Sequence, residues 1–335
     1  MMDLRQSRRQ ALAFAAAALA GIVLTGLAAA GPPGQTVRVG ILAVIPPTFD
    51  PSINPNAREL VEGLRELGYK PGQDIVLEYK SAQGDVKVLP QLLAELVNSK
   101  PDMIVTTVAE PTLAAATKTI PIVMVGVPDV VETGLVASLA RPGGNITGLA
   151  VNAAEIAAKR VQLLRDAVPH LSRAAVLWNA TNPGMVLGFQ NIEKASPQLG
   201  VTIQSVRVTG SDEFDRAFGA IEKNRPDGLV VLYGPMRGDD LPRIVEFVKQ
   251  RKLPTIFELG RGVRGGGLME FGPNYLNMFR RAAFYVDKIA NGAKPADLPV
   301  EEPSQFELII NMNAAKHMGI EVPHSLLMRA DRVIE

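Results

Sequence analysis

The sequence predicts an α/β protein built as two doubly wound parallel-sheet lobes joined by a hinge of three chain crossings. Three observations support this fold class. Apolar β-branched runs alternate with amphipathic helices, the order of these elements restarts in the second half, and three extended segments can connect the halves. Strands alternating with such helices form parallel sheets with right-handed crossovers. A single longer sheet is the alternative, but the restart of the same order favours two lobes.

Three apolar runs of the first half have counterparts in the second half, in the same order. The pairs are GILAVIPP (40–47) with AAVLWNATNP (174–183), PDMIVTTVAEP (101–111) with PDGLVVLYGP (226–235), and IPIVMVGVP (120–128) with LPTIFELGR (253–261). The helices between them also match. Leu60, Leu64 and Leu67 share one face of the first helix, and Gly68 ends it, as Gly200 ends its counterpart.

Three segments are candidates for the crossings between the lobes. Residues 129–149 contain a predicted helical stretch, a Pro-Gly-Gly turn and an extended run, and the other candidates are 265–274 and 301–313. We therefore expect lobe 1 to comprise residues 36–147 plus about 272–304. Lobe 2 then comprises residues 148–271 plus about 305–335.

The first 30 residues are typical of a secretory signal peptide. A basic segment containing Arg8 and Arg9 precedes an apolar run from Ala11 to Leu24, and Ala28-Ala29-Ala30 fits a cleavage site. We expect cleavage near Ala30, a soluble mature protein and a periplasmic location. The arginine pair does not decide between the Sec and Tat routes. The chain has no Cys, which excludes a lipoprotein, disulfides and cysteine metal sites.

Composition and motifs exclude several classes of function. The 35 Lys and Arg residues balance 34 Asp and Glu residues, so no basic patch for nucleic acid is predicted. His170, His317 and His324 lie away from the predicted strand ends, and no base accompanies a nucleophile there. The motif GRGVRG (260–265) lacks the strand and helix that a dinucleotide fingerprint needs. We therefore predict no enzyme activity, no metal and no cofactor.

The polar side chains that follow the predicted strands are mild in chemistry and suit recognition of a small solute. Ligands of open parallel sheets bind beyond the carboxyl ends of the strands, and in two facing lobes these ends border one cleft. The candidate ligand-binding residues are Thr48, Thr106, Thr107, Glu110, Pro111, Thr112, Asp129, Asn179, Tyr233, Glu258 and Phe271.

Two of these roles have alternatives. Pro111 fits the first position of a helix, whose free N–H groups attract an anion, and the threonine hydroxyls add donors. Thr106 and Thr107 are equally explained by β propensity at a strand end. Tyr233 and Phe271, like Trp178, belong either to the core or to a wall of the ligand site.

Two long stretches resemble one known family. IPIVMVGVPDVVETGLVASLARPGGNITGL (120–149) and GGGLMEFGPNYLNMFRRAAFYVDKIANGAKPADLPVEEPSQFELIINMNAAKHMGI (265–320) are similar to ABC transporter substrate-binding proteins of the putative tryptophan/tyrosine transport type. The resemblance implies the type 1 periplasmic-binding fold and a receptor that delivers a small solute to an inner-membrane permease driven by an ATPase. It also implies, among candidate ligands, an aromatic or other amino acid. We expect the chain to be a monomer.

In that family the ligand carboxylate is held after the third strand, a role that falls here on Thr106, Thr107, Pro111 and Thr112. The second-lobe contacts fall on Asn179, Tyr233 and Glu258. The sequence departs from the family pattern at Glu110, where relatives carry Ser or Thr, and at Asp129-Val130, where relatives often carry Asp-Pro. An inward carboxylate at position 110 would repel a ligand carboxylate. The alternative function is a ligand-sensing module that presents its closed state to a membrane receptor.

Overall fold

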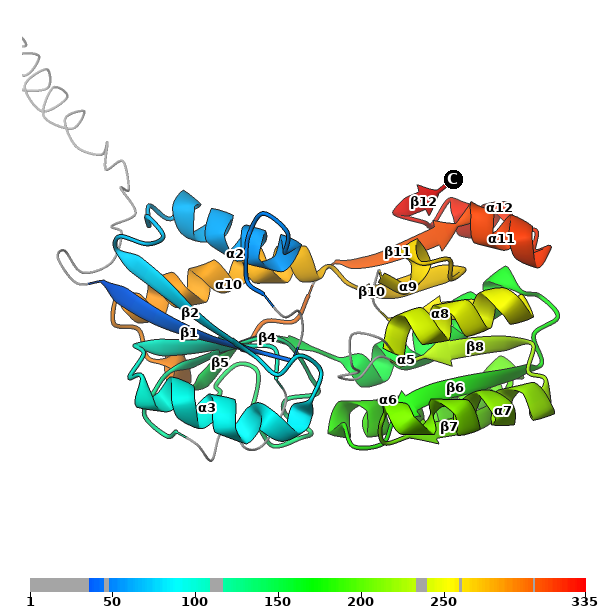
Figure 1. The fold of residues 1–335 in the computed structure, drawn as a ribbon, viewed down its shortest axis with the longest axis horizontal. Helices are drawn as coiled ribbons and strands as arrows, with labels where there is room; N and C mark the ends of the chain where they lie inside the picture. Colours follow the sequence, from blue (N-terminus) through cyan, green and yellow to red (C-terminus); the bar gives the residue numbers. More distant parts are fainter. Residues whose placement is uncertain (1–35, 45–47, 109–116, 233–239, 259–260, 304) are drawn as a thin grey trace, which may run out of the picture.

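Two α/β lobes lie end to end along the long axis of the molecule (Figure 1). The computed structural model describes residues 36–44, 48–108, 117–232, 240–258, 261–303 and 305–335. Each lobe is organised around one sheet covered by helices on both faces, as the repeated strand and helix order predicted. The predicted fold class is confirmed.

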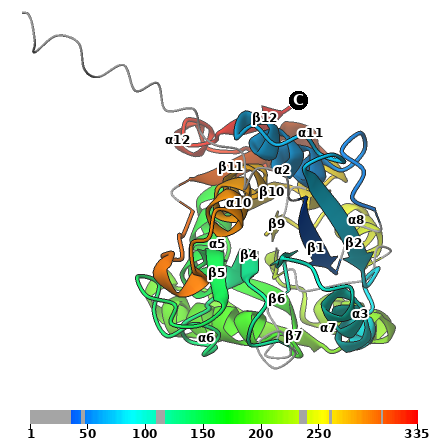
Figure 2. The same cartoon turned by 90° about the vertical axis from the view of Figure 1, so that its left-hand side faces the viewer.

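The sheet of lobe 1 is entirely parallel and has the order β2-β1-β3-β4-β5. Its strands are β1 (Val37–Ala43), β2 (Ile75–Ser81), β3 (Met103–Thr106), β4 (Ile122–Pro128) and β5 (Ile146–Val151). The helices α2 (Pro55–Glu66) and α10 (Tyr275–Ala290) cover one face and α3 (Leu89–Asn98) covers the other (Figure 2). A short 3₁₀ helix (Val86–Val88) precedes α3.

Continuous apolar runs form these strands because both faces of the sheet are covered. In β3, Met103 and Val105 belong to the core beneath α2 and α10, while Ile104 belongs to the core beneath α3. Successive side chains of a strand point to opposite faces, so every apolar residue of the run is buried.

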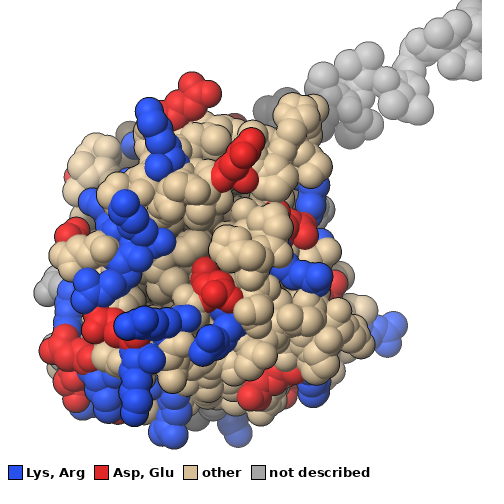
Figure 3. Space-filling view, turned by 90° about the vertical axis from the view of Figure 1, so that its right-hand side faces the viewer, with Lys and Arg blue, Asp and Glu red and all other residues tan. Residues whose placement is uncertain are grey.

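The sheet of lobe 2 has the order β12-β11-β10-β9-β8-β6-β7, and only β10 and β11 pair antiparallel. Its strands are β6 (Arg173–Asn179), β7 (Thr202–Val208), β8 (Gly228–Val231), β9 (Thr255–Phe257), β10 (Met269–Pro273), β11 (Phe306–Asn311) and β12 (Arg332–Ile334). Its longer helices are α5 (Ala153–Ala167), α6 (Pro183–Leu199), α7 (Phe214–Asn224) and α8 (Asp240–Arg251). Its shorter helices are α9 (Arg261–Arg264), α11 (Met312–Met318), α12 (His324–Leu327) and the 3₁₀ turn Ser211–Glu213, whereas the 3₁₀ turn Pro295–Asp297 contacts β5 of lobe 1. Figure 3 shows this lobe from its far end, where side chains of both charges share the surface.

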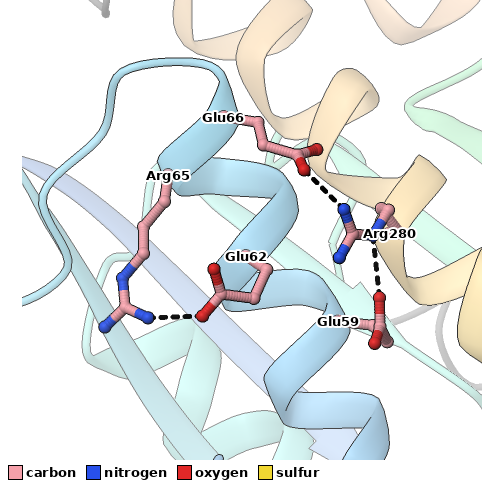
Figure 4. A network of polar contacts seen from close by, with 5 residues as sticks. All are labelled: Glu59, Glu62, Arg65, Glu66 and Arg280. Atoms are coloured by element: carbon pink, nitrogen blue, oxygen red, sulfur yellow. Dashed lines mark hydrogen bonds and ion pairs between the residues drawn. The ribbon is translucent and has the colours of Figure 1, made fainter.

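The lobes exchange one helix each. Helix α5 follows β5 of lobe 1 but packs on α6, and α10 follows β10 of lobe 2 but packs on α2. The contact between α2 and α10 is close, because a Cβ on Gly63 would lie 2.7 Å from the carbonyl oxygen of Arg280. Around it Arg280 bridges Glu59 and Glu66 (Figure 4). The second half of the chain therefore completes the core of lobe 1.

Three connections join the sheets. The first runs from β5 into α5, the second from β10 into α10, and the third returns to β11 after Glu301 pairs with Leu149 at the edge of β5. The lobes also touch directly, since a Cβ on Gly184 in α6 would lie 2.6 Å from Cγ of Pro128, the last residue of β4. The hinge thus combines three chain segments with a tight contact of side chain against backbone.

The helical stretch predicted within residues 129–149 is wrong. Residues 130–144 form turns and bends, and β5 begins at Ile146. Gly134 and Gly143 adopt positive φ values of 73° and 80°, which interrupt a helix, and Pro142 lacks the N–H that a helix requires. Among the helices of the described ranges, none is long and apolar enough to cross a membrane.

Candidate functional site

The carboxyl ends of the two sheets meet where the lobes face each other (Figure 1). The end of β4 contacts the first turn of α6, which follows β6 after a short loop. Asp129, next along the chain, accepts a hydrogen bond from the N–H of Ala154 in the first turn of α5 at 3.3 Å. The end of β4 in lobe 1 therefore lies against the first turns of α5 and α6 in lobe 2.

Lobe 1 contributes a small cavity at the carboxyl ends of β1 and β3, with a volume of about 30 Å³. Phe49 and Tyr79 stack with ring centroids 5.2 Å apart and form an aromatic wall beside it. The cavity is lined by Ile41, Leu42, Ala43, Phe49, Asn54, Asn56, Tyr79, Val105, Thr106, Thr107 and Phe279. The lining combines aromatic rings with a few hydroxyl and amide groups.

Two of the predicted threonines, Thr106 and Thr107, line this cavity. The Oγ1 atom of Thr106 accepts a hydrogen bond from the N–H of Val108 at 3.0 Å, and the residue is 1% exposed. Thr107 is half-buried and lines the cavity. Thr48 orders the loop before α2. Its Oγ1 accepts a hydrogen bond from the N–H of Asp50, and its carbonyl accepts one from Nδ2 of Asn54.

The start of α2 supplies residues that the sequence reasoning did not single out. Asn54 caps the helix by accepting hydrogen bonds from the N–H groups of Asn56 and Ala57. The Asn54-Pro55 pair is a recognisable helix start directly after the first strand, and it was the available signal for this part of the site. Phe279 comes from α10, more than 200 residues away in the sequence, and only the fold brings it to the cavity.

A buried charged cluster lies at the base of the hinge. Asp129 is 5% exposed with a left-handed φ of 48°, and its Oδ2 makes no hydrogen bond with the described residues. Burial raises the pKa of Asp129 to about 6, with the nearby charges of Glu132 and Glu258 acting in the same direction and the Ala154 N–H opposing them. A carboxyl with this pKa changes charge close to neutral pH.

Lobe 2 supplies the other members of the cluster. Glu258 follows β9 and forms an ion pair with Nη2 of Arg160 at 3.6 Å, and both side chains are buried. The Nε atom of Arg160 donates to the carbonyl of Phe271 at 2.8 Å, which ties α5 to β10. Burial raises the pKa of Tyr275, and the charge of Glu258 adds to the effect.

The ring of Tyr275 packs where β4 bulges. The pairing of β4 with β5 shifts register between Val125 and Val127, and Gly126 adopts a φ of 69° there. A Cβ on Gly126 would lie 2.5 Å from the Tyr275 ring, so this position needs glycine. The bulge redirects the end of β4 and places Asp129 against α5.

The remaining predicted residues occupy separate places. Asn179 ends β6, is buried, and accepts hydrogen bonds from the N–H and the hydroxyl of Thr181. The Phe271 ring stacks on Phe306 and lines a different groove of about 580 Å³, between α5, α6 and the third connection. Trp178 belongs to the core of lobe 2, stacked on Phe189. Glu110, Pro111, Thr112 and Tyr233 lie outside the described residues.

Comparison with known proteins agrees with this architecture. The family described as ABC transporter substrate binding protein matches residues 41–334. A tyrosine-binding protein of Clostridioides difficile (strain R20291) is 24% identical over 277 residues, which are 81% of this chain and 78% of that protein.

Two solved structures share the fold. A conserved domain protein from Vibrio cholerae has a TM-score of 0.81 and 27% identity, with 89% of this chain and 100% of that chain covered. An ABC domain from Streptococcus pneumonia in complex with L-Trp also has a TM-score of 0.81, at 24% identity, with 90% and 100% covered. Because the family match spans nearly the whole sequence, the chain belongs to the ABC transporter substrate-binding proteins, which bind solutes and are not enzymes.

Proposed function

We propose that the chain captures an amino acid with an aromatic side chain in the cleft between its lobes. The observation that carries the proposal is the aromatic wall of Phe49 and Tyr79 beside a cavity at the carboxyl ends of β1 and β3. Ligand sites of this kind combine apolar and aromatic walls with few polar groups, as Thr107 and Asn56 provide here.

The size of the cavity supports a site shared by both lobes. Its volume of about 30 Å³ is far below the roughly 300–1,000 Å³ of pockets that hold small molecules. Lobe 1 therefore supplies one wall, and lobe 2 completes the site when the lobes close about the hinge. A ligand that contacts both lobes only in the closed state shifts the population toward that state.

The relatives support the aromatic class. One curated relative is named a tyrosine-binding protein, and one structural neighbour was solved with L-Trp. An aromatic ring that stacks on Phe49 or Tyr79 gains more dispersion energy and buries more apolar surface than an aliphatic side chain of equal length. The proposal thus assigns the aromatic side chain of the solute to lobe 1.

The cellular role follows from the family and the N-terminal sequence. We infer that residues 1–30 direct export, that the mature chain works in the periplasm, and that its closed form docks as a monomer on an inner-membrane permease driven by an ATPase. The candidate binding residues after the strands, including Thr107, Asn179 and Glu258, are assigned to this capture step.

The proposal is tested by calorimetric titration of L-tryptophan, L-tyrosine, L-phenylalanine and L-leucine into the purified chain. We expect the aromatic solutes to bind and leucine to bind more weakly. Replacing Phe49 with Ala should weaken aromatic binding about tenfold to a hundredfold, since it removes both stacking and apolar contact.

A matched control is Phe284→Ala. Phe284 lies on α10, as Phe279 does, but its ring contacts Arg281 and Lys288 and does not line the cavity. Its aromatic affinity should equal that of the wild type. Absence of heat and of any thermal shift with every aromatic solute would overturn the proposal.

A further inference from the structure

A groove of about 580 Å³ lies at the hinge and shares no lining residue with the cavity of lobe 1. All three connections between the lobes contribute to it. Asn152 joins β5 to α5, Phe271 lies in β10 shortly before the chain crosses to α10, and Pro303 belongs to the returning connection. The volume falls within the roughly 300–1,000 Å³ of sites that hold small molecules. The groove is therefore large enough for a ligand of its own.

Two phenylalanine rings form an aromatic wall of this groove. Phe271 lies two residues before the partner of Phe306 in the antiparallel pair β10–β11, so the two rings are diagonal neighbours on one face of the sheet. Their centroids lie 5.9 Å apart with 29° between the ring planes, and both side chains are half-buried. The carbonyl of Phe271 accepts a hydrogen bond from Nε of Arg160 at 2.8 Å, which fixes the backbone that carries this ring. The wall is therefore held in place by the sheet and leaves ring surface open to a ligand.

Helices α5 and α6 supply the rest of the lining with apolar and polar side chains. The α5 residues recur at spacings of three or four and so share one face of the helix: Asn152, Glu155, Ile156, Lys159 and Gln162. Ala195 and Leu199 lie one turn apart on α6 and add apolar surface. Apolar walls with a few polar groups are typical of ligand sites.

The ionisable side chains of the groove carry a net negative charge, since Glu155 and Glu302 outnumber Lys159. The Nζ atom of Lys159 donates to Oε1 of Gln162 at 2.9 Å, which occupies the one cation of the lining. The exposed carboxylate of Glu302 makes no ion pair or hydrogen bond within the described residues. A positively charged ligand complements this distribution of charge.

We propose that the groove is a second ligand site, separate from the cleft between the lobes, for a flat aromatic molecule with one positive charge. The ring system of the ligand stacks on the wall of Phe271 and Phe306, and its charge lies toward Glu302. Aromatic faces attract cations as well as other rings, so the wall favours the same class of ligand. An occupant would contact all three connections and would therefore bind the segments about which the lobes move.

The experiment uses three probes of one ring system in calorimetric titrations at pH 7.5. At this pH 9-aminoacridine is a cation, acridine is neutral and acridine-9-carboxylate is an anion. The wild type should bind one 9-aminoacridine per chain. Acridine should bind about threefold more weakly and acridine-9-carboxylate at least about tenfold more weakly, because only the charge differs.

Phe306→Leu tests the aromatic wall. The substitution keeps an apolar side chain at the start of β11 but removes the ring, so 9-aminoacridine and acridine should both bind about threefold to tenfold more weakly. Phe284→Leu is the matched control. Phe284 is also half-buried, but its ring contacts Arg281 and Lys288 and lies outside the groove. This variant should bind both probes as the wild type does.

Glu302→Gln tests the charge of the site. It removes an exposed carboxylate and keeps the shape of the side chain, so 9-aminoacridine should bind about twofold to fivefold more weakly while the affinity for acridine stays unchanged. Glu193→Gln is the matched control, because that carboxylate is exposed on α6 but does not line the groove. Both affinities should be unchanged in this variant.

The outcomes separate this site from the cleft. Equal affinities for the three acridines overturn the cationic class of ligand. Equal effects of Phe306→Leu and Phe284→Leu, or no binding of any acridine, overturn the groove as a ligand site. Loss of 9-aminoacridine binding in Phe49→Ala but not in Phe306→Leu places the probe in the cleft and also overturns it. The proposed function is judged by L-tryptophan, so either can fail while the other stands.

Discussion

Lobe 1 and lobe 2 share a sheet order but differ in how that order ends. The order β2-β1-β3-β4-β5 of lobe 1 matches β7-β6-β8-β9-β10 of lobe 2, strand for strand. Beyond the fifth strand, lobe 2 adds β11 and β12. In lobe 1, the edge of β5 that faces away from β4 pairs, among the described residues, only through the single bridge between Leu149 and Glu301. The repeat is therefore complete up to the hinge and broken after it.

The difference shows that the C-terminal segment closes lobe 2 and braces lobe 1. The same connection that pairs with β5 through Glu301 continues into β11, which covers the edge of β10. Exposed strand edges invite pairing with other chains, and this one segment covers both fifth strands. Lobe 2 therefore has the wider sheet, while the edge of β5 in lobe 1 is covered by a residue of the hinge, Glu301.

The exchanged helices approach their partners at different distances in the two lobes. A Cβ on Gly63 would lie 2.7 Å from the Arg280 carbonyl oxygen and 2.8 Å from the Ala283 Cβ, whereas a Cβ on Gly188 in α6 meets Ala157 at an ordinary 3.5 Å. Gly63→Ala should lower the free energy of unfolding by about 1–3 kcal/mol, because α10 must move away. Gly188→Ala should raise it by about 0.5–1 kcal/mol through helix propensity.

Urea unfolding followed by circular dichroism measures both changes. Opposite signs for the two substitutions show that the exchanged helices are packed differently in the two lobes. Equal signs would mean that the pairs α2–α10 and α5–α6 are equivalent.

The fifth strands of the two lobes differ in their titratable side chains. Strand β5 carries no titratable side chain, whereas β10 carries Glu270, which is 9% exposed and whose Oε2 has no partner in the described residues. Burial raises the pKa of Glu270 from 4.5 to about 7, although the charge of Arg264 opposes the shift. In the unfolded chain the group ionises near 4.5, so the folded state binds more protons between these values and stability falls as pH rises.

We expect the free energy of unfolding to drop by about 2–3 kcal/mol between pH 5 and pH 8, with Asp129 contributing at the lower end. Glu270→Gln should remove most of the loss above pH 6, and Glu302→Gln should leave the profile unchanged. Denaturant unfolding at four pH values tests this expectation. A profile for Glu270→Gln that matches the wild type would assign the pH dependence to another group.

Substitutions at the helix ends should change the free energy of unfolding least. Lys100 after α3, Arg225 after α7 and Lys252 after α8 adopt positive φ values of 53°, 47° and 50°, where Gly200 after α6 has 62°. Replacing any of the three with Gly should stabilise the chain by about 0.5–1 kcal/mol, since a side chain disfavours this conformation. Gly200→Ala should destabilise it by a similar amount, and thermal unfolding resolves both shifts.

The shared part of the two lobes could be predicted because each repeated element carried its own local pattern. The leucines of α2 and the glycines that end α2 and α6 predicted helices and their ends. The turns between Val130 and Gly144 were misassigned, because their apolar residues pack onto the core of lobe 1 without helical hydrogen bonds. Local periodicity does not distinguish these two ways of burying an apolar side chain.

The candidate site was less predictable, because it depends on contacts between distant segments. Thr107 and Asp129 follow strands and could be named from topology alone. Phe279 and Arg160 sit within helical patterns that look like ordinary core and surface positions. Only the exchange of α5 and α10 brings them to the cavity and the hinge cluster.

The helix exchange also separates the order of synthesis from the order of folding. A ribosome that has made all five strands of lobe 1 has reached only residue 151, yet the helix that covers half of one face of that sheet ends at Ala290. Until then Leu60, Leu64 and the strand residues beneath α10 lack their covering layer. The first lobe of the chain is therefore among the last parts to complete its core, even though chains are generally expected to fold from the N-terminus as they emerge.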